Sequence, residues 1–358
     1  MLRLTSLSLV NFKNYEQANF NFCKKINCLT GSNGVGKTNV LDAVYLLSMT
    51  KSNLNPIDTQ NIRYDADFFV VQGEYERNET TETVYCAVKR GQKKVFRRNK
   101  KDYERLSEHI GLLPAVSISP ADGNLIYGRS DERRKLMNEV ISQHDHEYLH
   151  DMMQYNRALE QRNAMLKQDS ALNMEVLELW NEKLVTTGNK IYKRRSEYCQ
   201  ELIPVFQNFY NEIAGDGENV QLLYSSQLHD NDFAAMLNSS FTKDRLMQYT
   251  TTGIHKDDLL FQMNEYPLKK SASQGQQKTF LVAMKLANFD YIRKNGNIKP
   301  ILLLDDIFDK FDALRVKQII RLVAGEEFGQ IFITDTGNER TERILKEIDC
   351  VYQLHNIA

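Results

Sequence analysis

Residues 31–38 hold the pattern that constrains this chain most, a glycine-rich loop of the form G-x-x-x-x-G-K-[ST]. In order, the loop is Gly31, Ser32, Asn33, Gly34, Val35, Gly36, Lys37 and Thr38. Apolar residues in 26–30 predict a buried strand before the loop, and the apolar spacing of 39–47 predicts a helix after it. A strand, a glycine loop and a helix are the context in which this motif binds phosphate. The sequence therefore predicts a site for a nucleoside triphosphate.

The residue types in the loop suit that role. Glycines let successive backbone N–H groups turn toward phosphate oxygens, and the helix N-terminus adds a partial positive charge. Lys37 is expected to reach the β- and γ-phosphates, and the Thr38 hydroxyl is expected to bind Mg²⁺. The alternative is a glycine-rich turn that fits the pattern by chance, and both flanking segments argue against it.

A second motif lies near the other end of the chain. Residues 301–304 are four aliphatics, which predict a central parallel strand, and Asp305 and Asp306 follow directly. Asp305 is placed to hold the Mg²⁺ shell, the Walker B role. Asp306 is expected to point to the opposite side of the strand and to polarise an attacking water. A buried strand followed by an acidic turn is the alternative, which the pairing with a phosphate loop disfavours.

Residues 272–279 decide the class of nucleotide protein. Ser273, Gln274, Gly275 and Gln276 stand before an amphipathic stretch, where Ser273 is an ordinary helix N-cap. The segment also resembles the signature motif of ABC-type ATPases, in which such a helix start contacts the γ-phosphate held by a second subunit. The 32 residues that separate Ser273 from Asp305 leave room for one helix, a turn at 295–297 and the Walker B strand.

Other segments match the positions of ABC-type motifs. Residues 308–312 occupy the D-loop position, and 119–122 are the best Q-loop equivalent after a strand at 115–118. The triplet 72–74 mimics a Q-loop, but its position inside a predicted strand favours coincidence. Residues 330–336 predict a strand that ends where ABC ATPases usually carry a switch histidine, and this chain has none there.

Taken together, these segments resemble the RecF family of DNA replication and repair proteins, in order along nearly the whole chain. The residues that carry the resemblance are 2–15, 31–39, Leu41, 51–52, 119–120, Asp122, 133–134, Gly253, His255, 257–259, 272–277 and 303–306. The chain departs from the family pattern at Lys13 and Lys256, where arginine is usual, at Ile254, where proline is usual, and at Ala121, where glutamate is usual. A lysine keeps the charge but loses the planar fork of arginine, which puts a bidentate contact at those two positions in doubt.

The resemblance implies a fold and a function. It implies an α/β, ABC-type P-loop ATPase head of the Rad50 and SMC kind, with an inserted, mainly α-helical lobe in place of a long coiled coil. It also implies a homodimer formed around two ATP molecules with Mg²⁺, in which Ser273 acts in trans on the partner's ATP. Such a dimer binds gapped or duplex DNA and helps RecO and RecR to place RecA on SSB-coated single strands, in repair, replication and the SOS response to DNA damage. Slow, DNA-stimulated ATP hydrolysis then resets this switch.

The pattern of hydrophobicity divides the chain in three. Residues 1–127 are β-rich around one helix and are expected to form the first part of the head. Residues 128–245 are expected to form the helical lobe, with helices over 131–210 that break near 169–170 and 203–204. Residues 246–358 are expected to complete the head with the signature and Walker B motifs.

Composition sets wide limits. The net charge of −1 gives no overall nucleic-acid signature, so a DNA site must be a local patch. Five widely spaced cysteines indicate reduced thiols without a metal site. No signal-peptide pattern and no membrane-spanning apolar run occur, so a soluble, cytoplasmic protein without a membrane partner is expected.

Residues 89–101 contain eight basic residues and no acid, in the pattern of a hairpin and the following turn. The candidates for DNA contact are Lys89, Arg90, Lys93, Lys94, Arg97 and Arg98. A charge run is often only a solvated face, but clusters of this kind carry phosphate binding in a near-neutral protein. Phe96 alone is no stacking platform, which favours backbone contact. Lys190, Lys193, Arg194 and Arg195 are a second candidate, and Arg129, Arg133 and Arg134 could serve the nucleotide or the dimer.

Three other classes of protein are weaker interpretations. A P-loop kinase would have no use for residues 273–277, and an ABC transporter ATPase would carry a switch histidine and a membrane partner. An SMC-like structural clamp that binds ATP without a role in RecA loading is the nearest alternative. A long coiled coil would favour that clamp, and the helical segment is too short for one.

Overall fold

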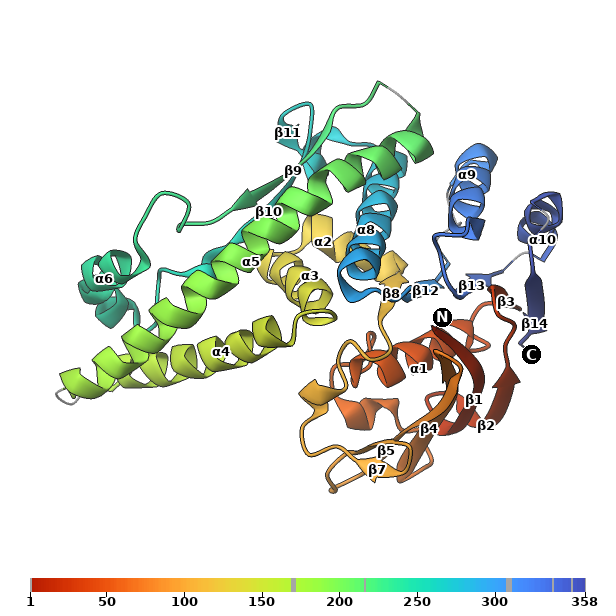
Figure 1. Ribbon diagram of the computed structural model, residues 1–358, viewed down its shortest axis with the longest axis horizontal. Coiled ribbons are helices and arrows are strands. Elements are labelled where there is room, and N and C mark those ends of the chain that lie inside the picture. The colour runs from red at the N-terminus through yellow and green to blue at the C-terminus, as the bar shows by residue number, and fades with distance from the viewer. Residues whose placement is uncertain are drawn as a thin grey trace. The chain divides into compact units, whose positions relative to one another are not determined.

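The computed structural model describes most of the chain, and its contacts divide it into two compact units (Figure 1). The described residues are 2–168, 172–215, 217–306, 311–336, 338–348 and 350–357. Unit 1 comprises residues 1–122, 209–215 and 281–358, and unit 2 comprises residues 123–208 and 216–280. This division does not test the bounds predicted from the sequence (1–127, 128–245 and 246–358), so they stay a prediction.

Unit 1 contains a parallel sheet of five strands. Its strand order is β14 (Tyr352–Asn356), β3 (Ile26–Thr30), β13 (Ile331–Asp335), β12 (Ile301–Leu304) and β8 (Ala115–Ile118). Strands β3 and β12 are buried along their full length, as expected for strands covered on both faces. Because the strands are parallel, the loops that follow β3, β8 and β12 leave from the same edge of the sheet.

A six-stranded antiparallel sheet forms the rest of the β structure of unit 1. Its order is β2 (Tyr15–Asn21), β1 (Leu2–Phe12), β4 (Phe68–Arg77), β5 (Thr80–Lys89), β6 (Val95–Arg98) and β7 (Lys101–Asp102). Strand β1 alternates buried and partly exposed residues, which is the pattern of a sheet with one face on the core. The predicted strands at 68–75 and 83–88 are confirmed, and residues 72–74 lie inside β4 as expected.

Helix α1 (Lys37–Met49) packs against strands of both sheets, namely β4 and β5 of one and β8 and β13 of the other. Val40, Val44 and Leu47 of this helix are fully buried in one core with Leu4 of β1 and Phe332 of β13. The helix that carries the phosphate loop is therefore fixed on two sides. Helices α9 (Ala313–Ala324) and α10 (Asn338–Glu347) complete unit 1 with most of α8 (Gln274–Gly296) and short turns of 3-10 helix at 58–61, 106–108 and 120–123.

Unit 2 is mainly helical. Its helices are α2 (Asn124–Tyr127), α3 (Ser130–Ser142), α4 (His146–Leu166), α5 (Met174–Ala214), α6 (Phe233–Met247), α7 (Leu268–Ser271) and the first turns of α8, with a 3-10 turn at 254–256. A small antiparallel sheet joins β11 (Tyr266–Pro267), β10 (Asp258–Met263) and β9 (Val220–Ser225). The helical structure predicted over 131–210 is confirmed in α3, α4 and α5.

The helix break predicted near Ile203–Pro204 is wrong, because α5 continues through Pro204. A proline inside a helix removes one backbone hydrogen bond and crowds the preceding turn. Leu202 and Phe206, on either side of it, are buried, and their packing offsets that cost. The other predicted break, near 169–170, lies outside the described residues.

Two further findings concern the chain as a whole. All five cysteines are free thiols, as the sequence indicated. In the part of the chain that the structure describes, no helix combines the length and the apolar character needed to cross a bilayer.

Candidate functional site

The phosphate loop has a backbone shape that only glycine adopts readily. Gly31, Gly34 and Gly36 have φ angles of 149°, 86° and 112°, values that other residues rarely take. A Cβ atom on Gly31 would lie 2.3 Å from the carbonyl oxygen of Ile357, and one on Gly36 would lie 2.5 Å from the side chain of Asn14. The glycines are therefore required both by conformation and by the close approach of neighbouring groups.

Side chains of the β1–β2 hairpin hold this loop in place. The Asn14 amide donates to the carbonyl of Val35 at 2.9 Å, and Asn39 donates to the Asn14 side-chain oxygen at 2.7 Å. Burial raises the pKa of Tyr15 to about 12, so its hydroxyl stays protonated and donates to the carbonyl of Gly36 at 3.2 Å. These contacts were not foreseen, because nothing in the local spacing connects positions 14 and 15 with a loop about twenty residues away.

Lys37 lies inside the curve of the loop. Its side chain is buried, and its ammonium group donates to the carbonyls of Gly31 at 2.8 Å and Ser32 at 2.9 Å. A lysine ammonium has three donors, so one remains for a phosphate oxygen even while both carbonyls are contacted. Helix α1 begins at this residue without a side-chain cap and without an acid in its first turn, so no side chain competes with an anion for the N–H groups at its start.

The two nucleotide motifs meet at Thr38 and Asp305. The Thr38 hydroxyl donates to Oδ1 of Asp305 at 2.8 Å, across 267 residues of sequence. Thr334, at the end of β13, donates to the same oxygen at 2.9 Å. Burial raises the pKa of Asp305, and the two hydroxyl hydrogen bonds act against that rise. A hydroxyl and a carboxylate at this edge of the sheet are the oxygen ligands that Mg²⁺ accepts, so these residues fit that ion.

Asp306 lies beside the same threonine. Its backbone N–H donates to the Thr334 hydroxyl oxygen at 2.8 Å, and its Oδ1 lies 3.3 Å from that oxygen. The expectation that Asp306 points to the opposite side from Asp305 is wrong, because β12 ends at Leu304 and Asp306 has a φ of 44°. Strand alternation does not continue past the end of a strand. Thr334 lies in the segment 330–336, where ABC ATPases usually carry a switch histidine and this chain has none. No feature of the sequence indicated that Thr334 would contact both aspartates.

The candidate Q-loop segment lies next to these carboxylates. Ser119 lines the same small cleft as Thr38 and Asp305. Asp122 accepts from the Ser119 N–H at 2.8 Å and forms an ion pair of 2.8 Å with Lys285 of α8, which also donates to the Ser117 carbonyl. Residues 119–122 are therefore held in a fixed turn directly after β8. The D-loop candidate is residues 308–312, of which 308–310 lie outside the described residues.

The signature segment in unit 2 forms a capping box at the start of α8. The Gln276 N–H donates to the Ser273 hydroxyl at 3.3 Å, and the Ser273 N–H donates to the Gln276 side-chain oxygen at 2.8 Å. The predicted capping role of Ser273 is confirmed. Ser273 and Gln274 are exposed, and the Ser273 hydroxyl keeps its own hydrogen for another acceptor.

The basic hairpin is less free than its sequence suggested. Lys94 is bound to both oxygens of Asp58 and to the Thr50 carbonyl, and Arg98 pairs with both oxygens of Glu82. Arg97 pairs with Asp102 at 2.8 Å at the surface. Phe96 is buried in the core, so it is no stacking platform. Lys89, Arg90 and Lys93 are exposed and form no ion pair with the described residues.

The second basic cluster, in unit 2, is largely neutralised. Arg195 is 1 % exposed and pairs with Asp257 at 2.7 Å, so it is wrong as a candidate for DNA contact. Lys190, Lys193 and Arg194 each have an acidic partner. Arg133 pairs with Asp258, and Arg134 donates to the Asp257 carbonyl, so both help to hold β10 and the residue before it. Arg129 is exposed.

The two lysines that depart from the family pattern have different surroundings. Lys13 is nearly buried and forms an ion pair of 2.5 Å with Asp42 of α1, an end-on contact that a single ammonium group can make. Asp42 also accepts from Ser52 and the Asn53 N–H, which ties the segment after α1 back to that helix. The ammonium of Lys256 lies 5.0 Å from the centre of the Tyr249 ring.

Comparison with known proteins gives three kinds of match. The family model described as RecF/RecN/SMC N terminal domain matches residues 3–357. The DNA replication and repair protein RecF of Phocaeicola vulgatus is 52% identical over 353 residues, which are 98% of this chain and 95% of the relative. The RecF protein of Flavobacterium johnsoniae is 48% identical, over 99% of this chain and 100% of the relative.

Solved structures agree. A structure of the recombination mediator protein RecF-ATPrS in the RecFOR pathway superposes with a TM-score of 0.88 at 28% identity, over 100% of this chain and 96% of that one. The Smc head domain of Pyrococcus furiosus, with a TM-score of 0.58 and 15% identity, shares the fold, covering 96% of this chain and 92% of that one. The α/β, ABC-type fold with its helical lobe is thereby confirmed. The chain belongs to the RecF family of DNA replication and repair proteins.

Proposed function

We propose that this protein is an ATP-dependent DNA-binding protein of replication and recombinational repair, in which the bound nucleotide controls dimerisation. The observation that carries the proposal is the hydrogen bond between Thr38 and Asp305, which joins the phosphate loop to the second nucleotide motif. A chance glycine turn would have no reason to meet a buried aspartate 267 residues away. Relatives solved as RecF-ATP and RecF-ATPrS support ATP as the nucleotide.

Each residue of the nucleotide site has a distinct role. Loop N–H groups and Lys37 bind the phosphates, and Thr38 and Asp305 would hold Mg²⁺, which would neutralise charge on the phosphate oxygens. Asp306 orients the attacking water. Its side chain is one methylene shorter than the glutamate of many related ATPases, and the hydrogen bond from its backbone N–H to Thr334 holds the residue close to the strand end, so turnover is slow. ATP hydrolysis resets the ATP-dependent switch and does not serve a metabolic reaction.

Ser273 completes the site of a second copy of the chain. Its hydroxyl is exposed at the start of a 23-residue helix and keeps a hydrogen for a phosphate oxygen. The partner protomer supplies the same group in return, so two ATP molecules join two copies. Because each ATP is contacted by both copies, nucleotide binding and dimerisation are coupled.

The ATP-bound dimer binds gapped or duplex DNA and, with RecO and RecR, promotes loading of RecA on SSB-coated single strands. The similarity to RecF proteins over nearly the full length supports this role. Lys89, Arg90 and Lys93 are the basic side chains of the hairpin best placed to contact phosphates, because they are exposed and carry no internal ion pair with described residues. An SMC-like structural clamp without a role in RecA loading is the second candidate, supported by the shared fold.

Light scattering of the purified protein, with and without ATP, tests the nucleotide assignment. Lys37→Ala removes the phosphate contact, so the variant is expected to stay monomeric with ATP and to lose most ATP-dependent binding of a gapped duplex. Lys243→Ala, an exposed lysine of α6, is the matched control. ATP-dependent dimerisation of Lys37→Ala at the wild-type level would show the loop assignment to be wrong. RecA loading on SSB-coated gapped DNA then separates the mediator from the structural clamp.

A further inference from the structure

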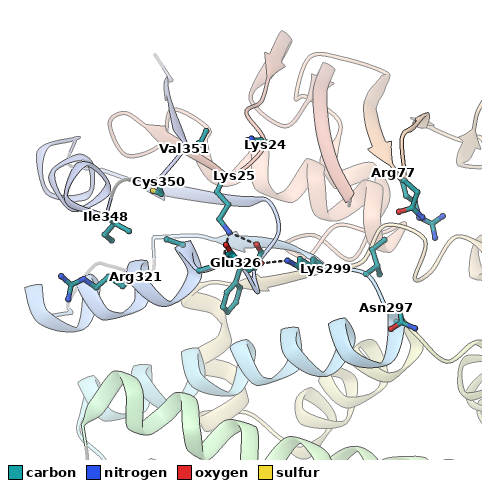
Figure 2. Close-up of a pocket in the computed structure, with 16 residues that line it drawn as sticks. Lys24, Lys25, Arg77, Asn297, Lys299, Arg321, Glu326, Ile348, Cys350 and Val351 are labelled. Atoms are coloured by element: carbon teal, nitrogen blue, oxygen red, sulfur yellow. Dashed lines mark hydrogen bonds between the residues drawn. The ribbon is translucent and has the colours of Figure 1, made fainter.

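A large pocket lies in unit 1 at the edge of the parallel sheet opposite the phosphate loop. It has a volume of about 1170 Å³, and part of its lining comes from residues shortly before four of the strands. Lys24 and Lys25 precede β3, Lys299 precedes β12, Phe328 precedes β13, and Val351 precedes β14 (Figure 2). The phosphate loop follows the other end of β3. The pocket is therefore separate from the nucleotide site.

The pocket is strongly basic. Five cationic side chains line it, namely Lys24, Lys25, Arg77, Lys299 and Arg321. Among the described residues that line it, Glu326 is the only acid. The net charge of the whole chain is −1, so the five cations around this cavity are a local concentration of positive charge. The pocket therefore has an electrostatic potential that favours an anionic occupant.

Part of this charge has a structural use. Lys25 donates to the carbonyls of Gly325 and Phe328, both at 2.7 Å, and Lys299 donates to the carbonyl of Glu326, as Figure 2 shows. These two lysines hold the turn between α9 and β13. The pKa of Lys25 is lowered by burial and by repulsion from the nearby charge of Lys299.

Lys24, Arg77 and Arg321 do not hold this turn. Lys24 and Arg321 are exposed, and neither forms a hydrogen bond or ion pair within the described residues. Arg77 has only a long contact of 3.9 Å to Glu82, and its Nε is buried without a partner. Lys25 and Lys299 are thus engaged at the turn, whereas Lys24, Arg77 and Arg321 have at most weak or long-range partners among the described residues.

Apart from Asn78 and Asn297, the rest of the lining is mainly apolar. Phe328, Ile348 and Val351 contribute to it, and Val351 is 52 % exposed. Phe328 is 5 % exposed and is stacked on Phe289, with ring centres 4.6 Å apart, so it offers no face on which a nucleotide base could stack. A concave site with an apolar wall and a cationic rim does not match the even, extended contact that a duplex backbone requires.

We infer that this pocket binds an acidic peptide segment of a partner protein, with carboxylates on the cations and one apolar side chain against Ile348 and Val351. Charge complementarity selects such a segment over a neutral one. The volume exceeds the 300–1,000 Å³ of typical small-ligand sites and suits several residues of extended peptide. The site adds a protein-docking surface at the far edge of the sheet from the nucleotide.

Fluorescence anisotropy of the full-length protein tests the inference. The probe is a short labelled peptide in which aspartates alternate with leucines, and the comparison peptides replace the aspartates with asparagine or the leucines with serine. We expect the acidic, apolar peptide to bind at least tenfold more tightly than either comparison peptide, with affinity falling as salt rises. Absence of binding, or equal binding of the asparagine peptide, would overturn the inference.

Variants locate the site. Lys24→Glu combined with Arg321→Glu reverses two exposed cations that form no hydrogen bond or ion pair with the described residues, and is expected to weaken peptide binding at least tenfold while ATP-dependent dimerisation is kept. Lys243→Glu makes a comparable exposed reversal elsewhere and should leave binding unchanged. Val351→Asp is a second variant, in case the double reversal prevents folding, and should weaken binding as well. Wild-type affinity in a folded pocket variant would contradict the assignment.

A nucleic-acid arm completes the design. An oligothymidylate of similar length is titrated against the same proteins, and we expect it to bind more weakly than the acidic peptide and not to displace it. Displacement of the peptide by the oligothymidylate, with equal sensitivity to the Lys24 and Arg321 reversals, would make the pocket a nucleic-acid site and refute the peptide. Because dimerisation with ATP is measured in parallel, failure here is distinguishable from failure of the nucleotide assignment.

Discussion

At the scale of single residues, Thr334 connects the two acidic side chains after β12. Its hydroxyl oxygen accepts from the Asp306 N–H, and its one hydrogen lies within reach of Asp305 at 2.9 Å and of Asp306 at 3.3 Å. The shorter contact makes Asp305 the favoured acceptor. Asp306 therefore keeps a carboxylate with spare acceptor capacity, which is what orientation of a water requires.

Asp306→Asn tests that role. An amide has almost the same shape as the carboxylate but is a far weaker base, so the variant is expected to bind ATP, to accumulate as the dimer and to hydrolyse at less than about a tenth of the wild-type rate. Wild-type turnover itself should lie below the ~10 s⁻¹ typical of enzymes. Steady-state phosphate release checks both, with the exposed Asp230→Asn as the control. Unchanged turnover in Asp306→Asn would remove this residue from catalysis.

His109 gives a prediction about pH. It is fully buried, with Nε2 2.7 Å from the Leu47 carbonyl and Nδ1 3.0 Å from the Tyr103 hydroxyl, so Nε2 carries the proton and Nδ1 accepts from the tyrosine. Burial lowers the pKa of His109 from 6.5 to about 4. The unfolded chain therefore takes up a proton at a higher pH than the folded protein does. Stability that is complete above pH 6.5 is lost as the pH falls toward 4, by roughly 3 kcal/mol for this group.

Urea unfolding of wild type and His109→Gln between pH 7 and pH 4 measures this contribution. Glutamine can donate to the Leu47 carbonyl and accept from Tyr103, but it does not titrate, so the free energy of unfolding should fall less steeply with decreasing pH. His150→Gln, at an exposed position, controls for the substitution itself. Identical pH slopes for wild type and His109→Gln would contradict the prediction.

At the scale of single elements, the first turn of α8 carries the proposed intersubunit contact. The capping box fixes the Ser273 backbone and leaves its side chain at the surface. An arginine at this position would keep the helix but place a long side chain where a phosphate should approach. The position is thus suited to a mixing experiment that asks whether the contact acts between copies.

Singly, Ser273→Arg and Lys37→Ala are each expected to fail to form the two-ATP dimer. When the two variants are mixed, the intact signature of one can face the intact phosphate loop of the other, so one composite site survives and part of the ATPase activity or dimer returns. Light scattering and phosphate release on the mixture provide the measurement. If mixing restores nothing while wild type dimerises, a crosslink between positions 273 and 37 of differently tagged chains decides whether the contact is within one copy.

The same elements show what a sequence can predict. The strand at 26–30, the loop and the helix after it were predictable because a local motif and a hydrophobic period specify them. The helix through Pro204 was not, because burial on either side outweighs a local breaker. Lys94 looked available for DNA because its partner Asp58 is 36 residues away and pairs with it only in the fold.

At the scale of the whole molecule, the charge that can meet DNA is smaller than the count of basic residues suggests. Ion pairs within unit 1 occupy Lys94, Arg97 and Arg98. Arg98 is pinned to Glu82, a carboxylate that is 7 % exposed, so loss of this arginine would leave a nearly buried charge without its partner. Substitutions meant to probe DNA binding should therefore avoid Lys94 and Arg98.

Replacement of Lys89, Arg90 and Lys93 by glutamine should weaken duplex binding for all sequences alike. Each lost phosphate contact should also reduce the slope of log affinity against log salt by about 0.9. Dimerisation with ATP should survive, because these residues lie outside the nucleotide motifs. Arg97→Gln, whose charge is already paired with Asp102, is the matched control for the hairpin. If the triple variant had wild-type affinity and the wild-type salt slope, the basic residues of the hairpin would be solvated surface rather than a DNA site.

The Asn14 and Tyr15 contacts with the phosphate loop have a consequence for nucleotide affinity. A glycine-rich loop that was free to sample many shapes would lose that freedom when it closed on a phosphate, and the lost entropy would weaken binding. Here Asn14 and Tyr15 already fix two loop carbonyls, and Asn39 donates to the Asn14 side chain. The loop is preorganised, so the strength of nucleotide binding depends in part on two side chains that need never touch the nucleotide.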